Sequence, residues 1–443
     1  MIKFLLYCLI ATGFLGSGAF PVSVGGVIHV FPYRLVFIVT MLAILVALCL
    51  NDRGLGLAGL RVRRQVKFLV FWWLVGALSI AWTPEPAEGV KCVILMGSHL
   101  MMVLLILVYL REPGDLRTFY ALWLCSFPVL LGLGFYNILT GHQFIEFSAA
   151  DDLFFESAYF RHKPRATFHN QNDYATYLTM SAPFVLSFMT HAKSRIAQLA
   201  AASVLALGVL VLSLTFSRAN FVGVAVGFGF WFVFLVRGLT SRLRILATVF
   251  GVVALLAVAL PSTYEPLSEL VGEQVSSISM EESSIKIRTN LAKNAFAFFL
   301  GSYGFGTGAG SSEHYMAHEG LYDTSGVTNV HNWWLEILVE YGVWVFAGYV
   351  MLYGGLLVGV LRIRAASSNA REREIGDALS TSMVTFLVAC AASSSVRDFL
   401  PQWLLLAFAL AYTNQAWRTK LSADRTPGCT LSSSGSPGLM AGP

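Results

Sequence analysis

Long apolar runs recur along nearly the whole chain and are separated by short polar segments. A helix that crosses the roughly 30 Å hydrocarbon core of a bilayer needs about 20 such residues. The runs predict twelve membrane-spanning helices, at roughly 4–20, 34–50, 66–82, 91–110, 118–139, 173–190, 196–215, 219–236, 243–260, 334–361, 377–395 and 400–417. They lack the alternation of apolar and polar residues that marks the strands of a β-barrel. The pattern therefore predicts an all-α, polytopic integral membrane protein.

The composition indicates one membrane-embedded domain. Hydrophobic residues make up 56% of the 443 positions and charged residues 12%, whereas soluble domains average about 25% charged residues. We expect a transmembrane domain over residues 1–420 and a disordered cytoplasmic tail over 421–443, which is rich in Ser, Gly and Pro. The first twenty residues resemble a signal peptide, but an uncleaved first helix is favoured. Most of the 6 cysteines lie in apolar runs, which argues against a disulfide framework.

Lysine and arginine residues concentrate near both termini and in the connections that follow the even-numbered spans. Cytoplasmic loops are enriched in these residues, so we expect both termini in the cytoplasm. The two long polar connections, 140–172 and 261–333, then lie on the outer side, the second between helices 9 and 10. Loops of this length commonly carry function. The net charge of +5 is attributed to the cytoplasmic loops, and no nucleic-acid partner is expected.

Basic residues on the expected outer side are few, which makes them informative. Arg218 lies between two apolar runs that are joined by a tight turn. An arginine at bilayer depth costs about 2.5 to 3.5 kcal/mol on insertion scales, so it normally has a partner or a purpose. The alternative is an interfacial arginine that extends its guanidinium to the membrane surface. The other outer cations are Arg34, Lys91, Arg161, Lys163, Arg165, Lys286, Arg288, Lys293 and Arg397.

The segment 161–178 places cations and amides directly before a predicted span that starts near Asn172. Pro164 and the Asn/Gln run favour a turn that ends at a helix N-terminus. Helix N-termini and guanidinium groups both bind phosphate oxygens, so Arg165 is a candidate anion ligand. A solvated loop cation is the alternative. Arg288, in the helix-like stretch 285–300, has a weaker claim, because a surface helix position also explains it.

A histidine lies at the outer mouth of the span that starts near 334. His331 has the pKa of a base at neutral pH, although a lone interfacial histidine is more often structural. Asn332 follows it, and Glu336 and Glu340 come next at helical spacing. The two carboxylates are candidates to orient the imidazole or to pair with an outer arginine, and a simple intramembrane ion pair is the alternative.

Metal binding has little support in the sequence. His314 and His318 have i, i+4 spacing and are followed by Glu319, but the order differs from the HExxH motif of zinc proteases. A solvated loop explains these residues equally well. No Gly-rich phosphate loop or paired acidic motif appears on the cytoplasmic side. We therefore expect neither a metal ion nor another cofactor.

Three ordered segments resemble the O-antigen ligase and O-antigen polymerase family. They are RATFHNQNDYATYL (165–178), LTFSRANFVGV (214–224), and GFGTGAG (304–310) followed by HNWWLEILVEYGVWVFAG (331–348). The resemblance covers about 165–360. It implies a metal-independent membrane glycosyltransferase that takes a glycan from an undecaprenyl diphosphate carrier. The glycan would pass to an acceptor hydroxyl at the outer face of the bacterial cytoplasmic membrane.

The resemblance also implies roles for individual residues. Arg165 and Arg218 would bind the diphosphate, and His331 would act as the base or position the acceptor. The first motif departs from the Asn-Pro-Asn of many relatives, since no proline stands between His169 and Asn172. The substrate-binding candidates are Arg288, Asn172, Asn332 and Glu336. A diphosphate leaving group gains negative charge as the glycosidic bond breaks, and guanidinium groups would neutralise it.

Several functions remain open at this stage. A ligase would use a lipid-glycan acceptor, and a polymerase would use a second copy of its donor. Transfer of the glycan to protein by an O-oligosaccharyltransferase is a related option. A twelve-helix transporter or flippase for lipid-linked oligosaccharide is the main rival, but it predicts more ionisable residues within the membrane than the sequence contains. A scaffolding protein would leave the outer cations unexplained.

Overall fold

The computed structural model describes residues 1–16, 22–24, 28–50, 60–144, 162–236, 243, 281–392 and 395–424. Its helices are α1 (Ile2–Gly13), α2 (Pro32–Leu50), α3 (Arg63–Ser79), α4 (Pro86–Tyr109), α5 (Pro113–Thr140), α8 (Gln171–His191), α9 (Arg195–Leu214), α10 (Arg218–Phe230), α13 (Glu281–Gly301), α14 (Ser312–His318), α15 (Trp333–Ala366), α16 (Ala370–Ala389) and α17 (Leu400–Asp424). The π-helical turn η2 (Trp231–Leu235) extends α10. Two short antiparallel strands, β1 (Val22–Val24) and β2 (Ile28–Val30), form the described strand structure. The chain is thus overwhelmingly helical.

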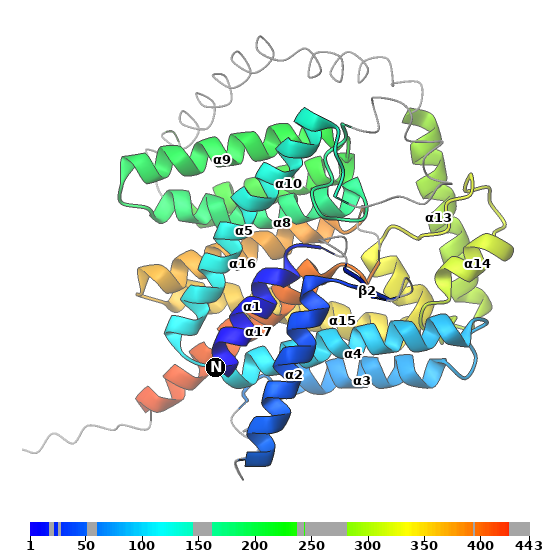
Figure 1. The fold of residues 1–443 in the computed structure, drawn as a ribbon, viewed down its shortest axis with the longest axis horizontal. Coiled ribbons are helices and arrows are strands. Elements are labelled where there is room, and N and C mark those ends of the chain that lie inside the picture. The colour runs from blue at the N-terminus through cyan, green and yellow to red at the C-terminus, as the bar shows by residue number, and fades with distance from the viewer. Residues whose placement is uncertain are drawn as a thin grey trace, which may run out of the picture.

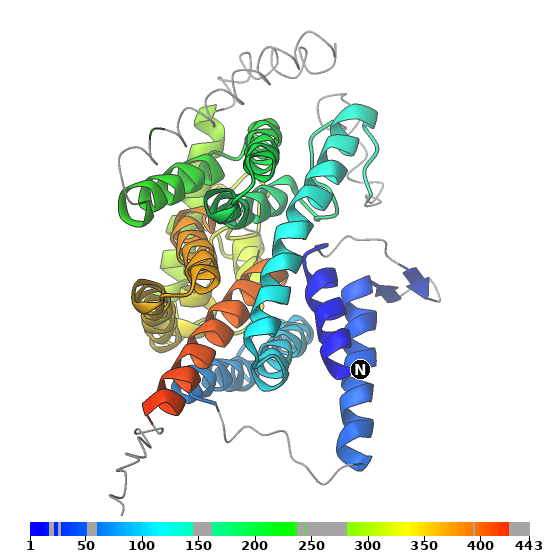
Figure 2. The same cartoon turned by 90° about the vertical axis from the view of Figure 1, so that its left-hand side faces the viewer.

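The helices form one bundle (Figure 1). The short helix α14 and the helix α13 lie together at the right-hand end in that view, while α8, α9 and α10 lie at the upper left. Figure 2 shows α1 and α2 side by side at the edge of the bundle. Because α2 packs mainly on α1, most of its apolar surface faces outward, as expected for a lipid-facing helix.

Eleven of the twelve predicted spans fall on helices of the structure. Among the residues that the structure describes, six helices are long and apolar enough to cross a membrane: α2, α4, α5, α9, α10 with η2, and α15. The predicted span 4–20 is too long, because α1 ends at Gly13. The predicted span 243–260 lies outside the described residues apart from Leu243. The protein is therefore polytopic, while the count of twelve spans and the cytoplasmic termini stay predictions.

The predicted tail also begins later than expected, because α17 continues to Asp424. The rest of the predicted tail lies outside the described residues, as do most of the outer connection 140–172 and residues 261–280 of the second connection. The remainder of that second connection contains α13 and α14. The helix expected over 285–300 is confirmed by α13.

Helices α8 and α16 lie against each other inside the bundle and are more polar than the lipid-facing helices. The Ser382 hydroxyl donates to the Met180 carbonyl at 2.6 Å, and the Ser187 hydroxyl donates to the Glu374 carbonyl at 2.7 Å. Small hydroxyl residues let helices pack closely and satisfy their own hydrogen bonds across the contact. These two helices are covered by protein, which explains why they are less apolar than α2 or α9.

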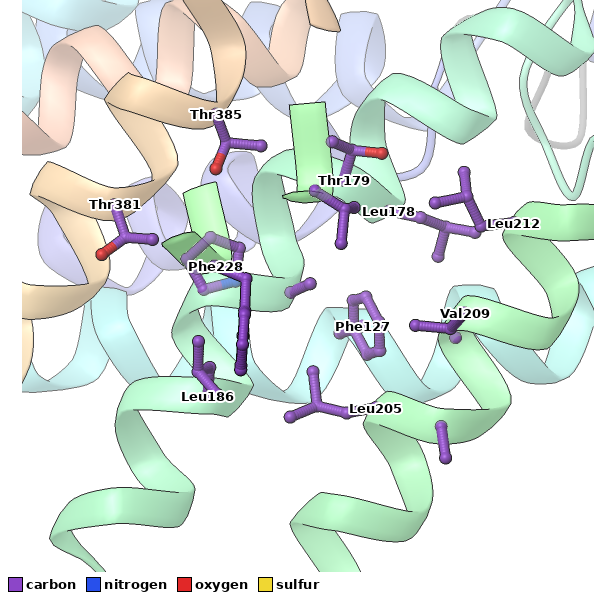
Figure 3. Close-up of a pocket in the computed structure, with 15 residues that line it drawn as sticks. Phe127, Leu178, Thr179, Leu186, Leu205, Val209, Leu212, Phe228, Thr381 and Thr385 are labelled. Carbon is purple, nitrogen blue, oxygen red and sulfur yellow. The ribbon is translucent and has the colours of Figure 1, made fainter. Parts of the chain in front are cut away.

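An apolar pocket of about 110 Å³ opens between α5, α8, α9, α10 and α16. Figure 3 shows Phe127 of α5 and Phe228 of α10 at its walls, with Thr179 of α8 and Thr381 and Thr385 of α16 beside them. Its other lining residues are almost all aliphatic. The pocket therefore suits a hydrocarbon chain better than a polar ligand.

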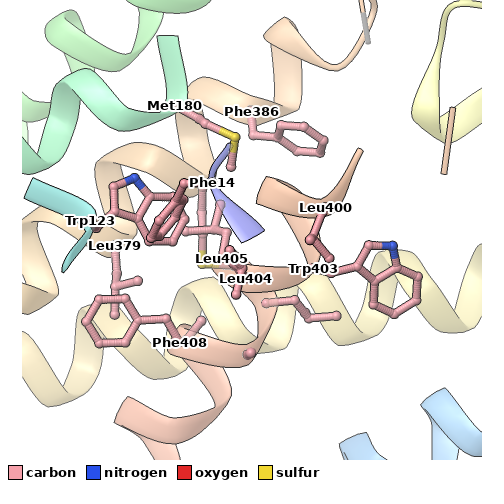
Figure 4. Close-up of a cluster of buried hydrophobic side chains, with 14 of the residues drawn as sticks. Phe14, Trp123, Met180, Leu379, Phe386, Leu400, Trp403, Leu404, Leu405 and Phe408 are labelled. Carbon is pink, nitrogen blue, oxygen red and sulfur yellow. The ribbon is translucent and has the colours of Figure 1, made fainter. Parts of the chain in front are cut away.

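Stacked aromatic rings hold α5, α8 and α17 together at the centre of the core. Figure 4 shows Phe14, Trp123 and Phe408 among the buried side chains of this core. The rings of Trp123 and Phe184 have centroids 4.4 Å apart, and those of Phe119 and Phe408 are 4.2 Å apart. Phe14, at the end of α1, packs on Trp123 at 4.8 Å. Offset stacking of this kind adds to the packing of the apolar surface. This packing fixes the core of the bundle, from which the ends of α8 and α15 extend.

The glycine-rich segment 304–310 packs against a break in α15 at Gly342. The Val343 amide donates to the Gly304 carbonyl at 2.9 Å, and the Thr307 amide donates to the Val339 carbonyl at 2.8 Å. A Cβ atom on Gly306 would lie 2.5 Å from the Glu340 carbonyl oxygen, and Gly306 also has a φ of +92°. Only glycine fits such a close backbone approach. The glycine-rich motif therefore orients the first part of α15, which follows His331.

Candidate active site

The residues before three helices gather at one end of the bundle. The Asn220 amide of α10 donates to the Thr176 hydroxyl of α8 at 3.3 Å. At the start of α15, the Trp333 amide donates to the Cys390 carbonyl, which directly follows α16, at 3.2 Å. The Arg288 guanidinium of α13 donates to the Ala391 carbonyl at 3.1 Å. These contacts bring the segments of Arg165, Arg218, Arg288 and His331 together.

Each of the three sequence motifs contains a residue in left-handed backbone conformation. Ala166, Phe216 and His331 have φ values of 49°, 57° and 50°. They account for three of the five non-glycine residues with positive φ in the part of the chain that the structure describes. Such conformations cost energy and concentrate at functional sites. The backbone thus marks the same three segments as the sequence did.

Arg165 lies in a buried turn ahead of α8. Its side chain and that of Lys163 are 7% and 6% exposed. The Asn137 amide oxygen accepts hydrogen bonds from the Ala166 amide at 2.7 Å and the Arg165 amide at 3.3 Å, which fixes the turn. The Lys163 ammonium lies 5.2 Å from the centre of the Phe216 ring. This contact places the turn beside the segment that leads into Arg218.

Helix α8 begins at Gln171, and Asn170 caps it by accepting a hydrogen bond from the Asp173 amide at 2.9 Å. The candidate Asn172 lies in the first turn, half-buried, and its carbonyl accepts a hydrogen bond from the Thr176 hydroxyl at 2.8 Å. The missing proline of the first motif therefore does not prevent a well-capped helix start.

Arg218 and Arg288 come from different helices and lie close together. Arg218 is the first residue of α10 and its side chain is exposed. Burial and the charge of Arg218 lower the pKa of Arg288. Two guanidinium groups therefore repel each other here, and a bound anion would relieve that repulsion. The proximity of Arg288 to Arg218 makes it a stronger site candidate than its sequence position indicated.

His331 lies near Arg288. Its amide donates to the Asn329 side-chain oxygen at 2.8 Å, and its buried Nδ1 has no hydrogen-bond partner among the described residues. Burial and the charge of Arg288 lower the pKa of His331 to about 4. The imidazole is therefore neutral near pH 7 and is able to accept a proton.

Two other candidates have clear structural contacts. The Asn332 side-chain oxygen caps α15 by accepting from the Trp334 and Leu335 amides, each at 3.1 Å. The Glu336 carboxylate is buried and accepts from the Ser395 hydroxyl at 2.8 Å and from the Val396 amide at 3.0 Å. These contacts do not direct the side-chain oxygens of Asn332 or Glu336 toward the arginines. Their substrate-binding roles stay predictions.

The sequence did not single out three residues that build the site. Lys163 was counted among the outer cations but was not assigned to the site. Asn137 and Asn220 are fully buried, and they fix the turns that precede Arg165 and Arg218. An asparagine inside an otherwise apolar run was the available signal, because buried amides are usually hydrogen-bonded for a reason.

The alternative metal site has only part of a ligand set. His314 pairs with Glu85 at 2.7 Å, and the His318 Nδ1 donates to the His314 carbonyl at 3.0 Å. Within the described ranges, no group of three or more His, Cys, Asp or Glu side chains is arranged to hold a metal ion. This pair therefore provides fewer side chains than a metal site needs.

The fold is that of a polytopic membrane protein in which Arg288 lies near both Arg218 and a neutral histidine. The family profile described as O-antigen ligase matches residues 201–350. The teichuronic acid biosynthesis protein TuaE of Bacillus subtilis (strain 168) is 32% identical over 420 residues, which is 94% of this chain and 85% of that protein. The chain therefore belongs to the O-antigen ligase family, as its motifs indicated. It is a multi-pass membrane enzyme of polysaccharide biosynthesis.

Proposed function

We propose that this enzyme transfers or polymerises a glycan from an undecaprenyl diphosphate carrier onto an acceptor hydroxyl at the outer face of the bacterial cytoplasmic membrane. The proposal is supported by the position of Arg288 near both Arg218 and His331, and by the turn of Arg165, which lies beside the segment that leads into Arg218. Guanidinium groups pair well with phosphate oxygens. Lys and Arg residues concentrate in the loops that are predicted to be cytoplasmic, and this supports a site that faces the outer side.

The proposed reaction is a displacement at the sugar carbon that carries the diphosphate. The acceptor oxygen forms the new bond to that carbon, and the bond between the carbon and the diphosphate oxygen breaks. The bonding electrons leave with the diphosphate, whose growing charge the arginines stabilise. The hydroxyl proton passes to His331, which is neutral at the start of the step. In this proposal the charge stabilisation comes from the arginines alone.

The apolar pocket of Figure 3 is a candidate binding site for the prenyl chain. Val224 lines this pocket and follows Arg218 by six residues on the same helix, a rise of about 9 Å. Thr179 lines it one turn beyond Thr176, which holds Asn220. A carrier with its diphosphate at Arg218 would therefore extend its hydrocarbon chain between α8 and α10.

The relative TuaE takes part in teichuronic acid biosynthesis, which favours a surface polysaccharide as the product here. A polymerase and a ligase use the same donor chemistry and differ in the acceptor. Transfer to protein and transport of the lipid-linked glycan are the rival proposals. Transport requires no base, so the neutral His331 favours an enzyme.

Substitution of the arginines tests the proposal. We expect Arg218→Ala and Arg165→Ala to abolish glycan transfer in a deletion strain, while both variants remain folded in the membrane. Lys293→Ala is a matched control, because Lys293 is an exposed cation of α13 that lies over the Tyr322 ring. Accumulated single repeat units would indicate a polymerase, and accumulated full-length lipid-linked chains would indicate a ligase. Full activity of both variants would overturn the site.

A further inference from the structure

A second cavity lies away from the arginine site, between α2 and α4. It has a volume of about 560 Å³. On α4 its lining residues repeat at helical spacing from Ala87 to His99, so one face of that helix forms a wall. This wall is about 18 Å long at 1.5 Å per residue. The facing wall is the first part of α2, which includes Tyr33 and Phe37.

The cavity is polar at one end and mostly apolar along its length. Arg34 at the start of α2 and Lys91 in the second turn of α4 line the cavity, and both side chains are exposed. Arg34 lies over the Phe31 ring at 4.9 Å. Ile94 and Leu95 follow further along α4. A charged rim above an apolar groove matches the shape of a lipid with an anionic headgroup.

A buried polar atom supports a ligand within this groove. His99 lines the groove and is 5% exposed, and its Nδ1 has no hydrogen-bond partner in the described part of the chain. Its ring lies between those of Tyr33 at 6.3 Å and Trp403 at 5.6 Å. Buried polar atoms are normally hydrogen-bonded, so this one indicates an absent partner.

Carboxylates near the rim have partners of their own. Glu88 accepts from Lys91 at 3.2 Å and from Arg397 at 3.3 Å, and Asp398 accepts from Arg397 at 3.1 Å. The Lys91 pair is exposed on both sides and therefore weak. Arg397 is largely neutralised by its carboxylates. Arg34 and Lys91 line the rim with exposed side chains, and they are the cations that we assign to the headgroup.

The groove also leads toward the histidine. Arg397 lines this groove and a small polar cavity that includes Val330 and Glu336. Val330 directly precedes His331. A headgroup at the rim would therefore extend its sugar toward the segment that carries His331. Two lipid-linked reactants need separate places around one reacting centre.

We propose that the groove between α2 and α4 binds the acceptor as a lipid with a phosphate-bearing headgroup. This inference rests on the proposed function, because it assigns the second reactant of the same reaction. Arg34 and Lys91 bind the phosphate, the faces of α2 and α4 hold the chain, and His99 contributes a hydrogen bond inside the groove.

Native mass spectrometry of the full chain with undecaprenyl diphosphate tests this assignment. Wild type is expected to bind two molecules per chain. The double variant Arg34→Gln/Lys91→Gln is expected to bind its second molecule about 30-fold more weakly, since each interfacial cation contributes to anionic lipid binding. The variant Ile94→Trp, which fills the groove, should bind one molecule. Leu78→Trp, at an exposed position of α3 outside the groove, should still bind two.

The result distinguishes this inference from the proposed function. Arg165→Gln/Arg218→Gln should also retain one molecule, and retention of two there would contradict the donor site instead. Two molecules bound with unchanged affinity in both groove variants would overturn the acceptor groove. Displacement of the groove-bound molecule by an equal amount of phosphatidylglycerol would also overturn it, because the groove would then hold bulk phospholipid.

Discussion

Arg397 and Arg288 lie near the same end of the bundle but have opposite surroundings. Arg397 contacts the carboxylates of Glu88, Glu313 and Asp398. Burial opposes its charge, yet the charges of Asp398 and Glu313 raise its pKa. Arg288 instead donates to a backbone carbonyl, and burial and the charge of Arg218 lower its pKa.

The contrast indicates that Arg397 stabilises the fold, whereas we propose that Arg288 binds an anionic ligand. A charge that is already neutralised by a partner within the protein attracts a charged ligand only weakly. A cation placed near another cation raises the free energy of the empty site, and an anionic ligand lowers it again. The carboxylate cluster therefore joins α4, α14 and the segment after α16, whereas Arg288 lies near the like charge of Arg218.

Between these two arginines, the larger effect is expected at Arg288. Arg288→Gln should reduce the rate of transfer by about 10² to 10³-fold, which is the usual loss when one charge-stabilising donor is removed. The melting temperature should change little, because the substitution also removes the repulsion from Arg218. Turnover of purified enzyme is the measurement, with Lys293→Gln on the same helix as the control. A rate within threefold of wild type, a margin of about 0.7 kcal/mol, would count against a role for Arg288.

A smaller effect of a different kind is expected at Arg397. Arg397→Gln should lower the free energy of unfolding by on the order of 2 kcal/mol, because three carboxylates lose a cation but are partly exposed to water. Turnover per folded molecule should stay close to that of wild type. Thermal unfolding in detergent measures the first quantity, with the exposed Lys91→Gln as control. Loss of turnover without loss of stability would contradict a structural role for Arg397.

The smallest effect concerns pH. The pKa of His331 is about 4 in the folded protein, below its ordinary value of 6.5. The imidazole stays neutral above this value and is protonated as the pH falls through about 4, so kcat/KM should fall only there. Arg288→Gln removes a nearby positive charge and should move this acidic limb to higher pH. A wild-type limb near pH 6.5 would contradict the buried, cation-flanked histidine.

Local patterns were enough to predict much of this fold. Apolar runs of spanning length are visible without tertiary information, and eleven of the predicted spans coincide with helices. The glycine-rich motif was visible as well, but its function was not. Gly306 packs on the Glu340 carbonyl and Val343 bonds to Gly304, and these partners are more than thirty residues apart. Contacts at such separation leave no local signal.

The candidate site was predicted in part. The charge bias selected Arg165 and Arg218 because both are expected on the sparsely basic side, and His331 was selected because it lies at the mouth of a predicted span. Arg288 received less weight because a helix position alone does not reveal that Arg218 lies beside it. Asn332 and Glu336 were chosen for their proximity in sequence to His331, and their oxygens turned out to cap α15 and to bind the segment after α16.

Separate measurement of donor binding and transfer tests the central claim most directly. Undecaprenyl diphosphate binding and glycan transfer would be measured on the same preparations of wild type, Arg218→Gln and His331→Ala. The arginine should be needed for binding, and the histidine only for transfer. We therefore predict that His331→Ala binds the carrier like wild type without transferring glycan, and that Arg218→Gln loses the donor-site molecule and the transfer. Normal binding and transfer by Arg218→Gln would contradict the account.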